Sequence, residues 1–122
     1  AMHFFAENNR VALQVEALKA GDFEKFKKIV IESGHSSYMY NQNIYLNNRP
    51  SFQPVSVALC LSEKLLSGKG AWRVHGGGFA GTIQAFVPKA QLKSYTDEMS
   101  AVFGENSCFV LDVRPVGGVK LI

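Results

Sequence analysis

The residues best suited to chemistry form a glycine-rich segment, residues 73–83, which reads Arg-Val-His-Gly-Gly-Gly-Phe-Ala-Gly-Thr-Ile. Four glycines stand within six positions, and each of them costs backbone entropy when the loop is ordered. Glycine is useful where φ must be positive or where a ligand approaches the backbone closely. The bare amides of such a loop can form a nest that receives an anion. We therefore take six residues as the candidate ligand loop: Gly76, Gly77, Gly78, Phe79, Ala80 and Gly81.

This glycine pattern differs from two well-defined phosphate-binding loops. No Lys-Ser or Lys-Thr pair follows it, as a Walker loop requires. A predicted strand follows it rather than a helix, which excludes the dinucleotide-binding fingerprint. On composition alone, a plain glycine-rich hairpin connection explains the segment as well as a loop that a ligand approaches.

Four further polar residues could line a cleft beside this loop. Arg73 and His75 come directly before the glycines, and His35 and Ser36 lie near the predicted end of a helix. For His35 we favour a capping or surface role over a role in the cleft, because a cation suits a helix C-terminus. For His75, a role in the cleft and a role outside it are equally well supported by the sequence.

No residue is assigned a catalytic or metal-binding role. Asp22 is a predicted helix cap, Asp97 falls on a solvated helix face, and Asp112 alternates out of a predicted strand. None of these carboxylates is paired with a base. Histidines lack Cys or carboxylate partners at ligand spacing, so no metal site is predicted.

The elements that would position these residues begin with helices. An apolar stripe at helical spacing runs through residues 4–18, and Gly21 ends that helix. Asp22 caps a second helix, which we expect to end near Gly34. Residues 38–45 could form a short helix, and a loop follows them. A third helix begins at Pro54 and ends at Gly68. The first stripe consists of Phe4, Val11, Val15 and Leu18.

The second part of the chain reads as strands around one helix. Alternation of apolar and polar residues predicts strands at residues 71–75, 82–87 and 107–113 and a short fourth strand at 119–122. An amphipathic pattern at helical spacing predicts a helix at 89–103. The fold class is therefore α+β, with an antiparallel four-stranded sheet packed by helices. The ferredoxin-like split βαβ arrangement is the nearest named architecture. We expect one domain over 1–122, helical over about 3–68 and sheet-forming over about 70–122.

Composition excludes several classes of protein. The chain has 122 residues, of which 47% are hydrophobic, so it can form a core and is not a disordered segment. Its net charge of +3 is spread along the chain, which argues against a nucleic-acid partner. No apolar run is long enough to span a membrane, and no signal peptide is predicted. Cys60 and Cys108 lie far apart, which suits reduced thiols and a cytoplasmic protein.

The glycine loop and its surroundings resemble the galactokinases of the GHMP kinase superfamily. Residues 73–82 are similar to their third motif, Arg-Met-Thr-Gly-Gly-Gly-Phe-Gly-Gly-Cys. Residues 7–11 and 17–23 are similar to their helix pair, and residues 32–37 to their Glu-Ser-His-x-Ser segment. The resemblance covers essentially the whole chain. His75, Ala80 and Thr82 depart from the motif, as expected of a divergent branch.

The resemblance implies that this chain is the C-terminal domain of such a kinase, ferredoxin-like in fold. The sugar-recognition motif, the main phosphate loop and the catalytic Asp belong to an N-terminal domain that this sequence lacks. ATP, Mg²⁺ and galactose would bind to the two-domain parent, and we expect none of them bound by this chain alone. The glycine loop would close the interdomain active site from this side.

The expected partner is therefore the N-terminal kinase domain. Without that domain, an apolar patch would be left uncovered on the helix from Pro54 and on the tyrosine-rich stretch before this helix. Such a patch would make the chain self-associate. We also expect Gly77→Val or Gly78→Val to damage catalysis by the parent more than its stability.

Two other classes of function stay open at this point. The first is a non-catalytic ligand-sensing or relic domain related to galactokinase. The second is a nucleic-acid-binding module, which would need exposed aromatics flanked by basic residues on the sheet. The strand at 107–113 offers only Phe109, so we favour this class least.

Overall fold

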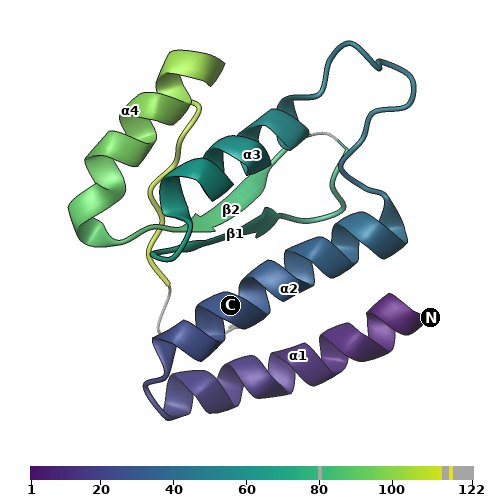
Figure 1. Ribbon diagram of the computed structural model, residues 1–122, viewed down its shortest axis with the longest axis vertical. Coiled ribbons are helices and arrows are strands. Elements are labelled where there is room, and N and C mark those ends of the chain that lie inside the picture. The colour runs from purple at the N-terminus through teal and green to yellow at the C-terminus, as the bar shows by residue number, and fades with distance from the viewer. Residues whose placement is uncertain (80, 114–115, 117–122) are drawn as a thin grey trace, which may run out of the picture.

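A computed structural model describes residues 1–79, 81–113 and 116 of the chain. Its helices are α1 (Met2–Lys19), α2 (Phe23–Asn41), α3 (Pro54–Leu66) and α4 (Leu92–Phe103), with a 3₁₀ turn η1 (Lys89–Gln91) before the last (Figure 1). The strands are β1 (Ala71–Val74) and β2 (Ile83–Phe86). The predicted helices at the start of the chain, from Pro54 and before residue 103 are thus confirmed, as are the first two strands.

The helical hairpin of α1 and α2 forms where the sequence predicts a corner. Gly21 turns the chain with φ +69°, and the Asp22 side chain accepts a hydrogen bond of 2.9 Å from the Lys25 amide. An N-terminal cap of this kind satisfies an amide that has no partner within the helix. The two helices lie side by side along one edge of the molecule in Figure 1.

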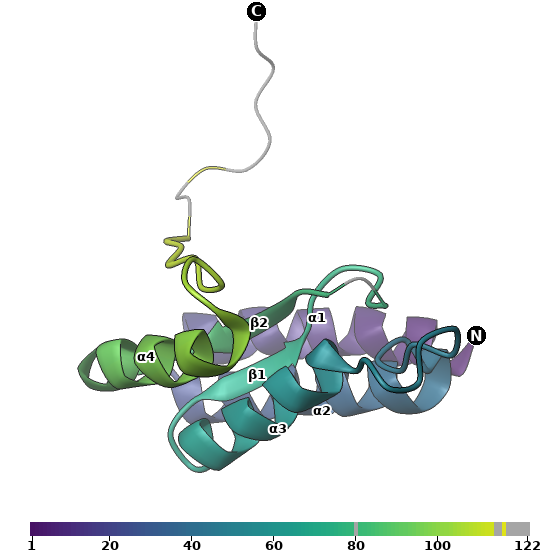
Figure 2. The same cartoon turned by 90° about the horizontal axis from the view of Figure 1, so that it is seen from above.

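The two strands form an antiparallel pair between two layers of helices. Their register places Trp72 opposite Ala85 and Val74 opposite Ile83. These side chains face α3 and α4, whereas Arg73 on the opposite face points toward α2. Figure 2 shows the same arrangement from above. The order of layers is therefore α1, α2, sheet, and then α3 with α4.

The main core lies on the α3 side of the sheet. Leu66 is fully buried there, and Trp72, Tyr95 and Met99 pack around it. Ser62 and Tyr95 share a hydrogen bond of 2.8 Å inside this core. Burial raises the pKa of Tyr95, and the Ser62 hydrogen bond opposes that rise only in part. The phenol is therefore neutral across the physiological range.

The four-stranded sheet predicted from the sequence is wrong for the part of the chain that the structure describes. The sheet there has two strands. Residues 107–113 form no strand, and Phe109 and Leu111 are 81% and 85% exposed. An alternating pattern makes a strand only where a neighbouring edge offers hydrogen bonds, and this segment leaves the body of the molecule (Figure 2). The predicted fourth strand, 119–122, lies outside the described residues.

Two predictions about the first helices are also wrong. α2 does not end near Gly34 but continues to Asn41, where Gln42 caps it with φ +50°. The predicted apolar stripe of α1 is not its packing face, since Phe4, Val11 and Leu18 are exposed. α1 contacts α2 through the polar residues Glu7 and His3 instead. An amphipathic pattern locates an apolar face without saying which neighbour will cover it.

The remaining features of the described part of the chain concern membrane crossing by the helices and exposure of the two cysteines. No helix in the described part of the chain is both long and apolar enough to cross a bilayer. Cys60 is exposed on α3, whereas Cys108 packs against the main core.

Candidate functional site

The glycine loop connects β1 to β2 and is closed at its base like a hairpin. The His75 amide donates a hydrogen bond of 3.0 Å to the Thr82 carbonyl oxygen. Gly76, Gly78 and Gly81 all have positive φ, at +68°, +77° and +114°. These glycines therefore serve the left-handed backbone that we expected of the segment. Ala80, the sixth residue of the predicted ligand loop, lies outside the described residues.

Gly77 and Gly78 have different surroundings although they are neighbours. Among the described residues, a Cβ built on Gly77 would meet no atom within 4 Å, and the φ of Gly77 is not positive. A Cβ built on Gly78 would lie 2.1 Å from the carbonyl oxygen of Asn43. Gly78 is therefore glycine because another part of this chain touches it, whereas Gly77 has open space in front of it.

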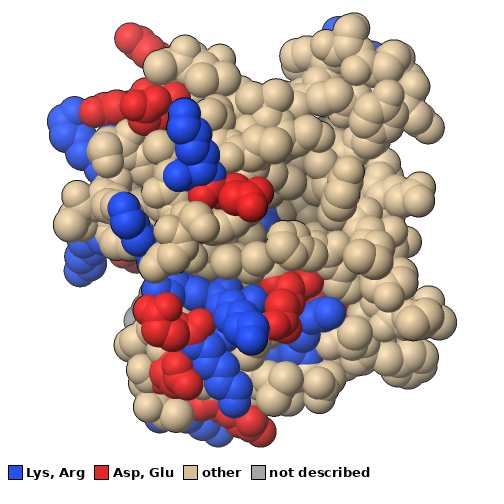
Figure 3. Space-filling model, viewed as in Figure 1, with Lys and Arg blue, Asp and Glu red and all other residues tan. Residues whose placement is uncertain are grey.

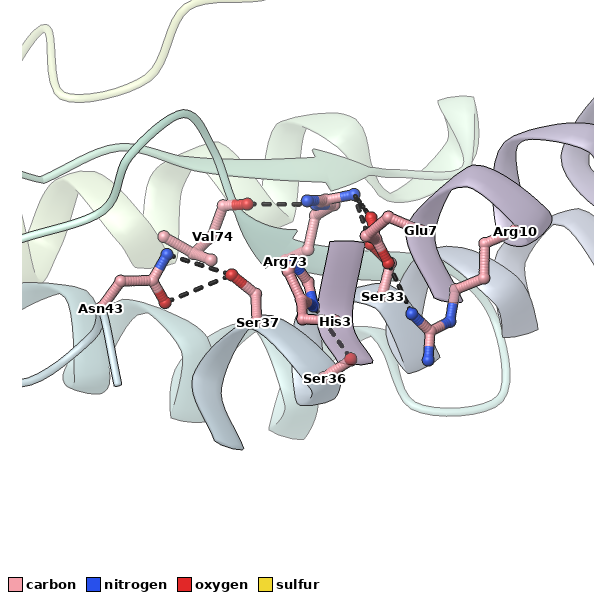
Figure 4. Close-up of polar contacts among 9 residues, drawn as sticks. All are labelled: His3, Glu7, Arg10, Ser33, Ser36, Ser37, Asn43, Arg73 and Val74. Carbon is pink, nitrogen blue, oxygen red and sulfur yellow. Dashed lines mark hydrogen bonds and ion pairs between the residues drawn. The ribbon is translucent and has the colours of Figure 1, made fainter. Parts of the chain in front are cut away.

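Asn43 is the residue that reaches the glycine loop from the segment after α2. Its backbone carbonyl oxygen accepts a hydrogen bond of 2.7 Å from the Phe79 amide, and its side-chain Nδ2 donates to the Gly77 carbonyl oxygen at 3.4 Å. Nδ2 and Oδ1 also contact the Ser37 hydroxyl at 3.0 and 3.2 Å (Figure 4). The end of α2 is thereby connected to the loop.

A shallow groove of about 540 Å³ opens beside the loop, between Phe79 on one side and the C-terminal end of α2 with the segment that follows it on the other. Its walls combine aromatic and amide side chains and carry no charge. They are formed by Tyr38, Met39, Asn41, Gln42, Tyr45, Asn47 and Phe79.

The face around this groove is poor in charge. In Figure 3 the Lys, Arg, Asp and Glu side chains gather over one half of the molecule. The other half, which carries the C-terminal end of α2, the start of α1 and residues 42–53, is almost free of them. We call this half the uncharged face. Its exposed large hydrophobic residues include Met2, Phe4, Phe5, Tyr38, Met39, Tyr40, Tyr45 and Phe52.

Arg73 is engaged in a polar network on the α2 side of the sheet (Figure 4). Its guanidinium donates to the Ser33 hydroxyl at 2.6 Å and to the Val74 carbonyl oxygen at 3.1 Å. The Ser33 hydroxyl donates to Glu7 at 2.6 Å, and Glu7 also pairs with Arg10 at 2.6 Å. The network ties α1 and α2 to the strand that leads into the glycine loop.

The charge of Glu7 is supported by these neighbours. Partial burial by itself would raise the pKa of its carboxyl, but hydrogen bonds from Ser33 and Arg10 and the charge of Arg73 outweigh burial. The pKa of Glu7 is therefore below its ordinary value of 4.5. A carboxylate with a lowered pKa stabilises the folded chain above its ordinary pKa, and this contribution disappears as pH falls through the lowered value.

Glu7→Gln is expected to lower the free energy of unfolding at pH 7 by about 1–2 kcal/mol, the usual size for hydrogen bonds to a charged group. The difference from the unsubstituted chain should shrink as pH falls below 4.5. Urea unfolding at several pH values between 7 and 3 measures it. Glu16→Gln, at an exposed position of α1, is the control and should show no such pH dependence. A difference that stays constant with pH would contradict the assignment.

The other predicted cleft residues are placed apart from one another. The exposed His75 borders the loop, while His35 is exposed on α2 in a depression with Glu24, Lys27 and Gly70, at the other end of β1. Ser36 is buried, and its hydroxyl lies 2.9 Å from Nδ1 of His3. The structure therefore places Arg73 and His75 at the start of the loop, with Arg73 in β1, and does not bring His35 or Ser36 to it.

Sequence reasoning missed Asn43, Ser37 and Glu7. Asn43 is one of several asparagines in a stretch with no clear periodicity, and nothing in its spacing connects it with residues 76–81. Glu7 and Arg10 stand at helical spacing, which signals a pair on one face but not a packed one. Among the described residues, no three His, Cys, Asp or Glu side chains come together as a metal site would need.

The chain is similar to galactokinases over about three quarters of its length. It is 32% identical over 94 residues to a galactokinase of Glaesserella parasuis serovar 5, and 31% identical over 93 residues to one of Actinobacillus pleuropneumoniae serotype 5b. These matches take in 77% and 76% of this chain but 23% and 22% of the relatives. The chain thus spans less than a quarter of the length of these curated relatives and is related to part of a galactokinase. No family model and no solved structure matches it.

Proposed function

We propose that this chain is the C-terminal part of a galactokinase-type enzyme, a divergent member of the GHMP kinase superfamily, which phosphorylates galactose with ATP in the cytoplasm. Its contribution is the glycine loop, placed in an active site between two domains. The observation that carries the proposal is the loop itself, since Gly77 faces open space beside an uncharged, aromatic groove. The relation to galactokinases supports the choice of reaction.

The chain by itself is proposed to be inactive. Phosphoryl transfer depends on positioning and on stabilising the charge of the transferred group, with Mg²⁺ bridging the phosphates. The residues that line the groove include no carboxylate that could bind Mg²⁺ and no Lys or Arg that could neutralise a triphosphate. They do not fit an ATP–Mg²⁺ complex, so ATP and Mg²⁺ are assigned to the two-domain parent.

The partner is the N-terminal kinase domain, which we place on the uncharged face. A large exposed apolar patch beside a candidate site is typical of an interaction surface. Aromatic residues such as Tyr38, Tyr45 and Phe79 are enriched at such surfaces. Without that partner the isolated chain is expected to self-associate, and a monomer in sedimentation at about 100 µM would contradict this use of the face.

Complementation tests the proposed function. The chain is mixed with the part of the Glaesserella parasuis galactokinase that it does not match, and galactose-dependent ADP release is measured. We expect turnover in the mixture and none from either part alone. Gly77→Val should fold normally and reduce turnover in the mixture, because its side chain would occupy the open space in front of the loop. ADP release by the chain alone, or no turnover from a mixture shown to associate, would overturn the proposal.

A ligand-sensing domain is the second candidate, favoured by the groove, which lies entirely within this chain. Calorimetry with ATP–Mg²⁺ separates the two. The kinase proposal expects no saturable heat below about 1 mM, or about −4 kcal/mol of binding free energy. Micromolar binding by the isolated chain would favour sensing.

A further inference from the structure

Asn43 lies at the centre of the contacts that hold the glycine loop. Its side chain is almost completely buried, with 4% of the residue exposed, whereas Phe79 in the loop is 48% exposed. Through its backbone and side chain it forms hydrogen bonds with Phe79 and Gly77, and its carbonyl oxygen occupies the space where a Cβ of Gly78 would be. One residue therefore touches three successive residues of the loop.

The loop needs such support because of its backbone. Phe79 has a φ of +54°, which is unfavourable for a residue with a side chain, by about 1–2 kcal/mol. The hydrogen bond of its amide to Asn43 helps to hold this conformation. The base of the loop is fixed separately, by the hydrogen bond between His75 and Thr82. Asn43 thus acts on the tip of the loop and the strands act on its base.

Asn43 is itself fixed by the end of α2. Ser37, which is 4% exposed, contacts both polar atoms of the Asn43 side chain. A buried amide that satisfies its hydrogen bonds in this way is held in one orientation. We propose that Asn43 is a positioning residue that sets the conformation of the glycine loop, an inference that rests on the proposed function for its effect on catalysis.

The same connection shapes the groove. Tyr38 follows Ser37, Tyr45 lies two residues after Asn43, and the Phe79 amide donates its hydrogen bond to the Asn43 carbonyl oxygen. The residues on both sides of the groove are therefore adjacent to this contact or part of it. Loss of the contact would therefore move the loop and open the groove together.

Hydrogen exchange and amide chemical shifts of the 122-residue chain test the proposal without any assay of activity. Asn43→Ala keeps the backbone carbonyl that accepts from the Phe79 amide but removes the side-chain bonds to Ser37 and Gly77 that hold this carbonyl in place. We therefore expect the Phe79 amide to exchange at least tenfold faster and the amide shifts of the loop to change. Ser37→Ala should produce the same changes to a smaller extent. Asn43→Asp keeps the size of the side chain and loses the donor to Gly77, so it serves if Asn43→Ala does not fold.

Gln53→Ala is the matched control. Gln53 is also an amide that holds a loop, through hydrogen bonds with Leu46 and Arg49, but it does not touch the glycine loop. It should lower stability to a similar extent and leave the Phe79 exchange and the loop shifts unchanged. A merely structural role for Asn43 would make the two variants alike, and unchanged loop shifts in Asn43→Ala and Asn43→Asp would overturn the proposal.

The complementation assay tests the effect of Asn43 on catalysis. Per folded molecule, Asn43→Ala should lower kcat by at least tenfold, whereas Glu16→Gln, at an exposed position outside the groove and the uncharged face, should not. If the unsubstituted mixture has no turnover, the proposed function fails, while altered loop shifts in Asn43→Ala would still establish the positioning role. If turnover is present and Asn43→Ala leaves both kcat and the loop shifts unchanged, the positioning role fails and the proposed function stands.

Discussion

Gly78→Val is expected to lower the free energy of unfolding by about 3 kcal/mol or more, whereas Gly77→Val should change it by less than about 1 kcal/mol. At Gly78 a Cβ would lie 2.1 Å from the Asn43 carbonyl oxygen and 2.8 Å from the Asn43 Cβ. The φ of +77° adds backbone strain for any residue with a side chain. At Gly77 neither problem exists, because no atom of the described part of the chain lies within 4 Å of the added Cβ and φ is not positive.

Urea unfolding of the two variants measures the difference as a shift in midpoint at constant slope. The result also bears on the expectation from sequence that both substitutions would harm catalysis more than stability. For Gly77 that expectation stays a prediction, whereas for Gly78 the contact with Asn43 leads us to expect a large loss of stability instead. Equal stability of the two variants would contradict the contact between Asn43 and the loop.

Local signals in the sequence were sufficient wherever the structure depends on local chemistry. The cap at Asp22, the turn at Gly21 and the proline that begins α3 all act within a few residues, and each was predicted. The glycines with positive φ were predicted as a group for the same reason. Which glycine is held by a distant contact could not be predicted, because Asn43 is far from Gly78 in the sequence.

Where the prediction was wrong, contacts with neighbouring elements determined the structure of the segment. The α1 stripe of Phe4, Val11 and Leu18 is a valid amphipathic pattern, but α2 presents Ser33 and Ser36 to α1, and these pair with polar residues. The segment 107–113 has the composition of a strand and finds no edge to pair with in the described part of the chain. A sequence pattern shows which structure a segment can adopt, and the neighbouring elements determine which structure it does adopt.

At Gly34, packing overrides a local sequence signal within a helix. The sequence suggested that α2 ends near Gly34, since glycine is unfavourable in a helix interior by about 1 kcal/mol relative to alanine. In the structure α2 passes through Gly34 because the helix lies directly on β1 there. A Cβ at this position would lie 2.9 Å from the Arg73 Cβ and 3.2 Å from its Cα. These atoms belong to the strand itself and cannot rotate away.

Gly34→Val is therefore expected to destabilise the chain by about 3 kcal/mol, since α2 must move away from the strand to admit the side chain. Gly34→Ala should also destabilise the chain, by about 1–2 kcal/mol, because its Cβ already makes the close contact with Arg73 and the gain in helix propensity offsets only part of that cost. Glu32→Val, at an exposed position two residues earlier in the same helix, controls for the lower helix propensity of valine. It should lower the free energy of unfolding by less than about 1 kcal/mol. Thermal and urea unfolding give these values.

The effect at Gly34 should extend to the candidate site. Arg73 lies under α2 at this contact and is hydrogen-bonded to Ser33, the residue before Gly34, so a displaced helix would break the connection between Glu7 and the strand that leads into the glycine loop. In Gly34→Val the stability difference caused by Glu7→Gln should consequently shrink, which a double-mutant cycle measures. Full additivity of the two substitutions would mean that the helix accommodates valine without breaking the contacts between Glu7, Ser33 and Arg73.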